Sequence, residues 1–332
     1  MRLTHLMMAS LAIGFTTSLQ AADFTFKYAH SQTDEAPRSE SMRYFKEALE
    51  ERSDGRIAVE LYFNGTLGKE EDVLQQVQMG LIQGYRGGLF AQANPAYLIY
   101  TMPFLFTTPE QAIDVMEGEL GQAINEGARE SQLHIPVTGV AGGMRQLTNN
   151  VRAVNQVDAL RGLKIRTPPL APTLRAFEAL GASPQQVPYT ETYMALRTGV
   201  VDGQENPPSN IADMKFHEAQ EYMSLLNWQI HPDPFFISAQ WYDQLPEELQ
   251  LIVDDVAQEM MTRSNEIWLA SEANYLETLG EHMSINDIAD EHRQGFVDAV
   301  VPVWEHFVER GDFSQEQLEQ VLALTDQAEV LE

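Results

Sequence analysis

The sequence predicts an α/β protein with two lobes, built on mainly parallel sheets and spanned by a long helix. Three observations support this prediction. Strand and helix patterns alternate over residues 23–88, a ten-residue pattern recurs about 120 residues later, and one helical pattern continues from Leu245 to His282. Alternating strands and helices are typical of parallel sheets. A chain of 332 residues is also long enough for two lobes with ample core.

The chain begins with the pattern of a signal peptide. Arg2 supplies a positive start, Leu6–Phe15 form an apolar centre, and small residues precede Ala21 and Ala22. We expect residues 1–21 to be a signal peptide that is cleaved near Ala21 or Ala22. The apolar centre is too short to span a bilayer, and no other stretch is long and apolar enough. The mature chain is therefore expected to be a periplasmic protein that does not span the membrane.

The first lobe is predicted from alternating patterns after this segment. Apolar residues alternate in the strand segments and recur at helical spacing in the helix segments, where Gly55 and Gly80 mark the ends. We expect strands over 23–30, 56–63 and 81–88, and helices over 41–55 and 70–80.

An internal repeat predicts that the second lobe has a related architecture. Residues 75–84 ("QQVQMGLIQG") align with residues 194–203 ("MALRTGVVDG"): each ends a helix with Gly, adds two aliphatic residues and a polar one, and closes with Gly. A strand pattern lies upstream of each copy, at 56–63 and at 163–167. Similar units at this separation indicate two lobes of one design, although any α/β unit can end its helices with Gly.

The C-terminal part is predicted to be mostly helical. The pattern from Leu245 to His282 is long enough to cross from one lobe to the other, and the last fifty residues form acidic, solvated packing helices.

Composition excludes several classes of function. The chain has 49 acidic and 21 basic residues, a formal charge of −28, so it should repel nucleic acid and anionic membranes. It contains no cysteine, which excludes disulfides, thiolate metal sites, a cysteine nucleophile and a lipidated N-terminal cysteine.

The segment "GVVDGQENPP", residues 199–208, concentrates special residues in one loop. Gly199 is expected to end a helix that starts near Thr190, and Gly203 to permit a close backbone approach. Asn206 precedes Pro207, which favours an extended backbone, so its amide can point into a cleft. The two prolines then help to set where the next element begins.

Four segments resemble the periplasmic solute-binding proteins of TRAP transporters, the DctP-like family. They are "NGTLGKEEDVLQQVQMG" (64–80), "GLKIRTPP" (162–169), "LGASPQQVPYTETYMALRTGVVDGQENP" (180–207) and "WYDQLPEELQ" (241–250). The resemblance covers essentially the whole mature chain. It implies a periplasmic-binding-protein-like clamp of two lobes, which closes on a small carboxylate and delivers it to the membrane permease subunits of the transporter.

The same resemblance implies an organisation and a set of partners. We expect lobe I to comprise residues 22–142 and 232–271, and lobe II to comprise residues 143–231 and 272–332, with the ligand cleft between them. The expected protein is a monomer that has no cofactor and no metal.

The resemblance also implies binding residues. Arg166 of the "KIR" strand corresponds to the carboxylate-binding arginine, Asn206 assists it, Arg145 in "GGMRQLTNN" is a second arginine, and Tyr189 lines the pocket. A guanidinium suits this role because its planar fork meets a carboxylate with two parallel hydrogen bonds. Each residue also has a structural alternative: an ion pair for the arginines, a loop contact for Asn206 and a core position for Tyr189.

Four further residues are candidates from their positions. Arg86 in "GYRGG" follows a predicted first-lobe strand, at the edge where α/β sheets bind ligands; its alternative is a salt bridge to a neighbouring acid. His30 and Ser31 end the first strand, and Glu70 follows "LG". This many polar groups suggests a sugar acid such as a uronate, or a C4-dicarboxylate.

Two other functions remain open at this point. An exported hydrolase or lyase acting on sugar acids could use Asp202 and Glu205 as acid and base. However, the chain offers no phosphate-binding glycine loop, and His217 with Glu218 and Glu221 lacks the second histidine of a zinc helix. The other alternative is a ligand sensor for a membrane receptor, which would share all of these features. We expect a binding protein and no enzyme.

Overall fold

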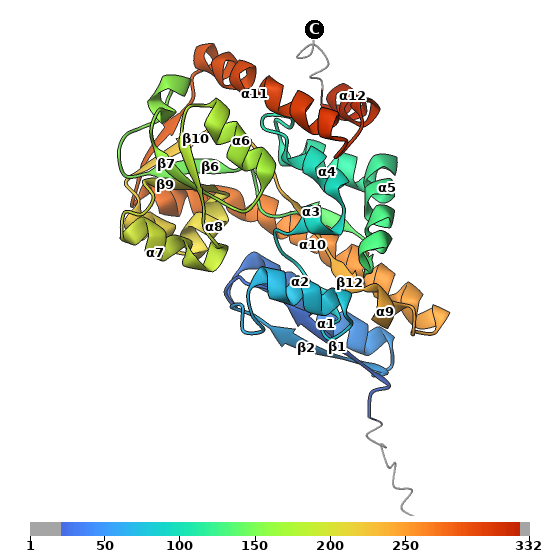
Figure 1. The fold of residues 1–332 in the computed structure, drawn as a ribbon. Helices are drawn as coiled ribbons and strands as arrows, with labels where there is room; N and C mark the ends of the chain where they lie inside the picture. The colour runs from blue at the N-terminus through green and yellow to red at the C-terminus, as the bar shows by residue number, and fades with distance from the viewer. Residues whose placement is uncertain (1–20, 326–332) are drawn as a thin grey trace, which may run out of the picture.

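The structure is a computed structural model that describes residues 21–325. The predicted signal peptide therefore lies outside the described residues, except for its last residue. The described residues form two large sheets flanked by helices and a small two-stranded sheet, with α10 running between the two regions that hold the large sheets (Figure 1). Within the described part of the chain, no helix combines the length and the apolar character needed to cross a bilayer.

The first sheet has the strand order β2-β1-β3-β12-β4, and the second has the order β13-β10-β6-β9-β7-β8. The strands of the first sheet are β1 (Phe24–Ala29), β2 (Ile57–Tyr62), β3 (Gly84–Tyr85), β4 (Leu133–His134) and β12 (Phe236–Ser238). Those of the second are β6 (Gln146–Asn149), β7 (Lys164–Thr167), β8 (Ser183–Gln186), β9 (Gly203–Asn206), β10 (Tyr222–Leu225) and β13 (Ser284–Asp287). Between the sheets, β5 (Thr138–Val140) pairs with β11 (Pro232–Pro234).

Helices cover both sheets and continue to the end of the described chain. The α-helices are α1 (Pro37–Arg52), α2 (Glu70–Gln78), α3 (Phe90–Ala93), α4 (Pro109–Glu117), α5 (Glu119–Gly127), α6 (Ala171–Ala179), α7 (Thr192–Arg197), α8 (Pro208–Asp213), α9 (Ala239–Tyr242), α10 (Glu247–Gly280), α11 (Asp290–Arg310) and α12 (Gln315–Leu324). Short 3-10 helices are η1 (Pro95–Thr101), η2 (Ala128–Ser131), η3 (Val157–Leu160), η4 (Tyr189–Glu191) and η5 (Phe216–Ala219).

The fold prediction of two α/β lobes spanned by a long helix is confirmed. Parallel pairs form the β-α-β units: β1 with β2 and β3 in the first sheet, and β7 with β8 and β9 in the second. The antiparallel partners β12 and β6 arrive from the opposite sheet, so they enter the ladder in the other direction. Helix α10 packs on α1 beside the first sheet and on α8 beside the second.

The internal repeat is a true structural repeat. Each large sheet contains a β-α-β-α-β unit in which the first strand of the unit lies between the other two, β2-β1-β3 and β8-β7-β9. Gly80 and Gly199 occupy equivalent places after α2 and α7, with φ of +77° and +71°, where L-residues with a Cβ are disfavoured. Residues 163–167 therefore correspond to β1, and the strand equivalent to residues 56–63 is β8, which the sequence did not predict.

Two predicted boundaries moved. Helix α1 starts at Pro37, before the expected residue 41, because Pro is favourable in the first turn of a helix. Of the expected strand over 81–88, only Gly84 and Tyr85 pair. The first sheet nevertheless has a dense apolar core, in which the rings of Phe26, Phe45 and Phe235 lie with centroids 5.0 to 6.0 Å apart.

The strands of the first sheet fall within 24–134 and 236–238, and those of the second fall within 146–225 and 284–287. The exact lobe boundaries, at residues 142, 231 and 271, stay a prediction.

Candidate functional site

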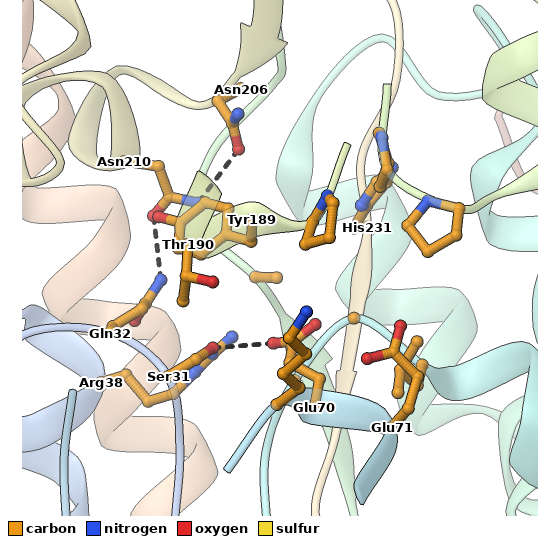
Figure 2. Close-up of a pocket in the computed structure, with 18 of the residues that line it drawn as sticks. Ser31, Gln32, Arg38, Glu70, Glu71, Tyr189, Thr190, Asn206, Asn210 and His231 are labelled. Atoms are coloured by element: carbon orange, nitrogen blue, oxygen red, sulfur yellow. Dashed lines mark hydrogen bonds between the residues drawn. The ribbon is translucent and has the colours of Figure 1, made fainter. Parts of the chain in front are cut away.

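A cavity of about 100 Å³ lies between the two sheets, at the ends of strands from both (Figure 2). The carboxyl ends of parallel strands are where α/β proteins usually bind ligands. The first-sheet side contributes residues after β1, in the first turn of α1, around the start of α2 and after β3. The second-sheet side contributes residues from β7, β9, α8 and the loops beside them. The polar lining residues are Ser31, Gln32, Arg38, Lys69, Glu70, Glu71, Arg145, Arg166, Tyr189, Thr190, Asn206, Asn210 and His231.

Arg166 lines this cavity and is buried without an ionic partner in the described part of the chain. It lies in β7 and is 1% exposed. Among residues 21–325, its Nε donates a hydrogen bond to the carbonyl of Val187 at 2.9 Å, and its two terminal nitrogens have no hydrogen-bond partner. Burial lowers the pKa of Arg166 from 12.5 to about 10, against the opposing attraction of Glu205. A buried guanidinium with an open fork is a site for an anion.

Arg145 also lines the cavity, but its charge is already compensated. Its Nε and Nη2 contact the carboxylate of Glu205, with Nη2 3.0 Å from Oε1. Nη2 also donates to Oδ1 of Asn206 at 3.1 Å. This pair is almost completely buried. In this structure Arg145 positions Asn206 and Glu205, and only its Nη1 lacks a hydrogen-bond partner within residues 21–325.

The glycine-proline loop is shorter than the sequence predicts, because residues 203–206 form strand β9, while Gly203 does permit the close backbone approach expected of it. A Cβ on Gly203 would lie 2.1 Å from the carbonyl oxygen of Thr148, so only glycine allows β9 to pair this closely with β6. Asn206 ends β9 in an extended conformation, and Pro208 is the first residue of α8. The loop thus places Asn206 at the cavity, where its Oδ1 also accepts from Nδ2 of Asn210 at 3.3 Å.

Tyr189 begins η4 and lines the cavity, with its hydroxyl buried. Within the described chain, that hydroxyl has no hydrogen-bond partner. Burial, with Asp213 nearby, raises the pKa of the hydroxyl. Tyr189 therefore contributes to the wall of the cavity with a neutral, buried hydroxyl, and its ring packs edge-on against Phe216, with centroids 6.2 Å apart.

Ser31 and Glu70 line the first-sheet side and contact each other. Ser31 Oγ donates to Glu70 Oε1 at 2.8 Å (Figure 2). Ser31 follows β1, and Glu70 is the first residue of α2, where the helix dipole favours a carboxylate.

His30 and Arg86 do not line this cavity. His30 lines a much smaller void behind the wall, and its Nε2 lies 2.9 Å from Ser39 Oγ. Burial lowers the pKa of His30 well below its usual value, and Arg38 and Arg86 add to this effect, so the ring is neutral. The six other predicted residues do line the cavity.

The expectation that Arg86 faces the cleft is not met in this structure. Arg86 is completely buried, and its guanidinium contacts the carboxylate of Asp233, Ser41 Oγ at 2.9 Å and Ser264 Oγ at 3.0 Å. These partners come from β11, α1 and α10, so Arg86 joins the elements that meet between the sheets. The placement matches the salt-bridge alternative weighed from the sequence.

Several lining residues were missed by the sequence reasoning. Arg38 is the clearest: it is buried in the first turn of α1, where the helix dipole disfavours a cation. A cation at this unfavourable position at the start of a helix was the sequence signal that could have identified Arg38 as a candidate. Gln32, Asn210 and His231 carried no signal, because each reaches the cavity only through the tertiary fold. Burial lowers the pKa of His231 well below its usual value, and Arg145 and Arg166 add to this effect.

Two interactions join the opposite sides of the cavity. Gln32 Nε2, after β1, donates to Asn210 Oδ1, on α8, at 2.9 Å (Figure 2). At the surface, Lys69 Nζ lies 3.1 Å from Glu191 Oε1. The structure therefore has its two sides in direct contact across the cavity.

The two carboxylates considered for catalysis are occupied elsewhere. Asp202 Oδ2 accepts a hydrogen bond from the backbone of Lys164 at 2.8 Å, and Glu205 is paired with Arg145. Asp202 does not line the cavity, so the two carboxylates do not face one substrate from a shared site.

Comparison with known proteins agrees with this architecture. The chain is 29% identical over 297 residues to the 2,3-diketo-L-gulonate-binding periplasmic protein of Escherichia coli strain K12, covering 89% of each chain. It is 28% identical over 311 residues to the C4-dicarboxylate-binding periplasmic protein DctP of Vibrio cholerae, covering 91% of each.

A solved structure has the same fold. A TRAP periplasmic solute-binding protein from Roseobacter denitrificans, crystallised with β-D-glucuronate, superposes with a TM-score of 0.86 at 25% identity, covering 90% of this chain and 99% of the other. Residues 28–310 match the DctP family, described as bacterial extracellular solute-binding protein, family 7. These relatives are binding proteins rather than enzymes. The chain therefore belongs to the DctP family of extracellular solute-binding proteins, the TRAP-transporter receptors that its sequence resembles.

Proposed function

We propose that this chain is the periplasmic receptor of a TRAP transporter, which captures a small organic acid in the cavity and delivers it to a membrane permease. The acid is a sugar acid, such as a uronate, or a C4-dicarboxylate. The single observation that carries the proposal is the unpaired, buried fork of Arg166 in a cavity between two lobes. A carboxylate there would form two parallel hydrogen bonds and compensate the buried charge.

Lobe closure supplies the mechanism. Residues on both sides line the cavity, so a ligand makes its full set of contacts only when the lobes are together. Binding then shifts the population towards the closed state. Closure also removes water, which strengthens the ion pair at Arg166. We propose that the permease recognises this closed form, and that the receptor acts as a monomer with residues 22–142 and 232–271 in one lobe.

The relatives support this class of ligand, because their names specify a diketo sugar acid and C4-dicarboxylates, and the similar structure holds a uronate. They also support the periplasmic location. We propose that the signal peptide of residues 1–21 is removed near Ala21 or Ala22 after export.

A thermal-shift screen tests the proposal. The mature protein is unfolded and refolded to remove carried ligand, then melted with a panel of sugar acids and dicarboxylates. A ligand at a thousand times its Kd adds about 4 kcal/mol to the free energy of unfolding. We expect at least one acid to raise the Tm, and Arg166→Ala to abolish that rise.

The matched control is Arg161→Ala. Arg161 lies in the same segment, but it is exposed and pairs with exposed Asp158. We expect this variant to keep the full Tm shift. If no acid raises the Tm, or if Arg166→Ala binds as tightly as the wild type, the proposed function is wrong.

A further inference from the structure

The first-sheet side of the cavity contributes a buried arginine of its own, Arg38. Its side chain is held rigidly: Nε donates to Asp233 Oδ2 at 3.1 Å, and Nη2 lies 3.0 Å from Oδ1. Both Arg38 and Asp233 are almost completely buried. Within residues 21–325, Nη1 of Arg38 has no hydrogen-bond partner. Arg38 therefore presents a fixed donor to whatever occupies the cavity.

Arg38 also carries uncompensated charge. Its only ionic partner among the residues that the structure describes, Asp233, is shared with Arg86, whose guanidinium contacts the same carboxylate. Two guanidinium groups and one carboxylate leave this cluster with one positive charge. Arg86 has further partners in Ser41 and Ser264 and lies away from the cavity, so the surplus is presented through Arg38.

Glu70 lies on the same side of the cavity as Arg38. Arg38, Ser31 and Glu70 all line this cavity, and Ser31 donates a hydrogen bond of 2.8 Å to Glu70 (Figure 2). A carboxylate only accepts hydrogen bonds, and a guanidinium only donates them. A ligand hydroxyl can satisfy both groups at once, because it donates to Glu70 and accepts from Arg38. A ligand carboxylate would be attracted by Arg38 but repelled by Glu70.

The charges around the whole cavity favour the same ligand. Arg166 and the Arg38 cluster contribute two uncompensated positive charges, whereas Arg145 is neutralised by Glu205. Lys69, which also lines the cavity, is paired with Glu191. With Arg166 assigned to the first ligand carboxylate, a second one would have only the Arg38 cluster left to attract it, in a lining that also holds the carboxylates of Glu70 and Glu71.

We propose that Arg38 and Glu70 form a hydroxyl-binding subsite, so that the ligand is a polyhydroxylated monocarboxylate rather than an unsubstituted dicarboxylate. This inference rests on the proposed function, in which Arg166 binds the ligand carboxylate. Arg38 and Glu70 then determine specificity at the other end of the ligand, and Asp233 is the positioning residue that fixes Arg38.

Calorimetric titration with two pairs of acids of equal chain length tests the subsite. The pairs are erythronate with succinate, and galactonate with adipate. We expect the hydroxylated monocarboxylate of at least one pair to bind tenfold or more tightly than its dicarboxylate partner. Glu70→Gln should weaken that binding about 10- to 100-fold, because it removes a charge-assisted hydrogen bond. It should weaken the dicarboxylate less or strengthen it, so the preference shrinks.

Asp72→Asn is the matched control. This substitution removes the same charge from the same turn of α2, but Asp72 is exposed and does not line the cavity. We expect it to leave both affinities within about twofold. The melting curve of each variant checks its fold, and the wild-type preference decides the question even if a variant does not fold.

Two results overturn the inference while the proposed function stands: dicarboxylates that bind as tightly as their hydroxylated partners, or a preference that Glu70→Gln leaves unchanged. The proposed function fails separately, and the subsite with it, if no carboxylate in the wider thermal-shift panel binds the wild-type protein.

Discussion

Arg166 should reduce the stability of the ligand-free protein. The perturbation is Arg166→Met, which replaces the guanidinium by an unbranched apolar side chain of similar length. In the wild type the guanidinium is buried without an ionic partner in residues 21–325, and its pKa is lowered from 12.5 to about 10 by burial. A base with a folded-state pKa below its unfolded value destabilises the fold wherever it is charged in both states. This cost is therefore fully present below about pH 10.

The magnitude follows from the size of the pKa shift. Each pKa unit corresponds to about 1.4 kcal/mol, so the buried charge costs about 3 kcal/mol at neutral pH. The substitution also removes the hydrogen bond to Val187, which is worth about 1–2 kcal/mol. We expect Arg166→Met to be about 1–2 kcal/mol more stable than the wild type without ligand, a rise in Tm of a few degrees.

Melting curves at pH 7 without ligand measure this effect, with Arg161→Met as the exposed control. The control should leave the Tm unchanged. Arg166→Met should raise the Tm, yet it should lose the Tm shift that an acid produces in the wild type. If Arg166→Met lowers the Tm of the ligand-free protein, Arg166 serves the fold, and the reasoning from its unpaired fork is refuted.

Three further predictions concern closure, pH and the loop. Lys69→Glu should weaken ligand affinity a few-fold at low salt, because it breaks the exposed pair with Glu191. Adding Glu191→Lys to this variant should restore the affinity in calorimetric titrations, and both effects should vanish at 1 M salt. Burial raises the pKa of Asp213 to about 6, which is above its unfolded value, so its contribution to stability is lost as the pH rises from about 4 to 6. The Tm advantage of Asp213→Asn over the wild type should therefore grow over this range; a constant difference would contradict it. Gly203→Ala should lower the Tm more than Gly199→Ala does, because the new Cβ at residue 203 would clash with the backbone of Thr148. At residue 199 the Cβ would enter open space, and the cost comes from the φ of +71° alone. Equal losses of Tm in these two variants would contradict the packing argument.

The parts of the site that could be predicted are those encoded locally. Asn206 follows from the Pro that comes after it, and Arg166 follows from the resemblance of its short segment to the DctP-like family. The repeat around Gly80 and Gly199 likewise predicted two related lobes, because a helix end with positive φ leaves a visible glycine.

The parts that could not be predicted depend on distant residues. Arg86 does lie at the end of a first-sheet strand, but its direction is set by Asp233, 147 residues further along the chain. Arg38 reaches the cavity through the same carboxylate. Strand β8, with the sequence "SPQQ", lies at a sheet edge and is mostly polar, so it shows no apolar alternation.

The most direct test of the central claim is a crystal structure of the mature protein with the acid that gives the largest Tm shift. The account predicts the ligand carboxylate on Arg166, with its two oxygens within hydrogen-bond distance of Nη1 and Nη2. A ligand whose carboxylate lies elsewhere in the cavity, with the fork of Arg166 still unpaired, would contradict it.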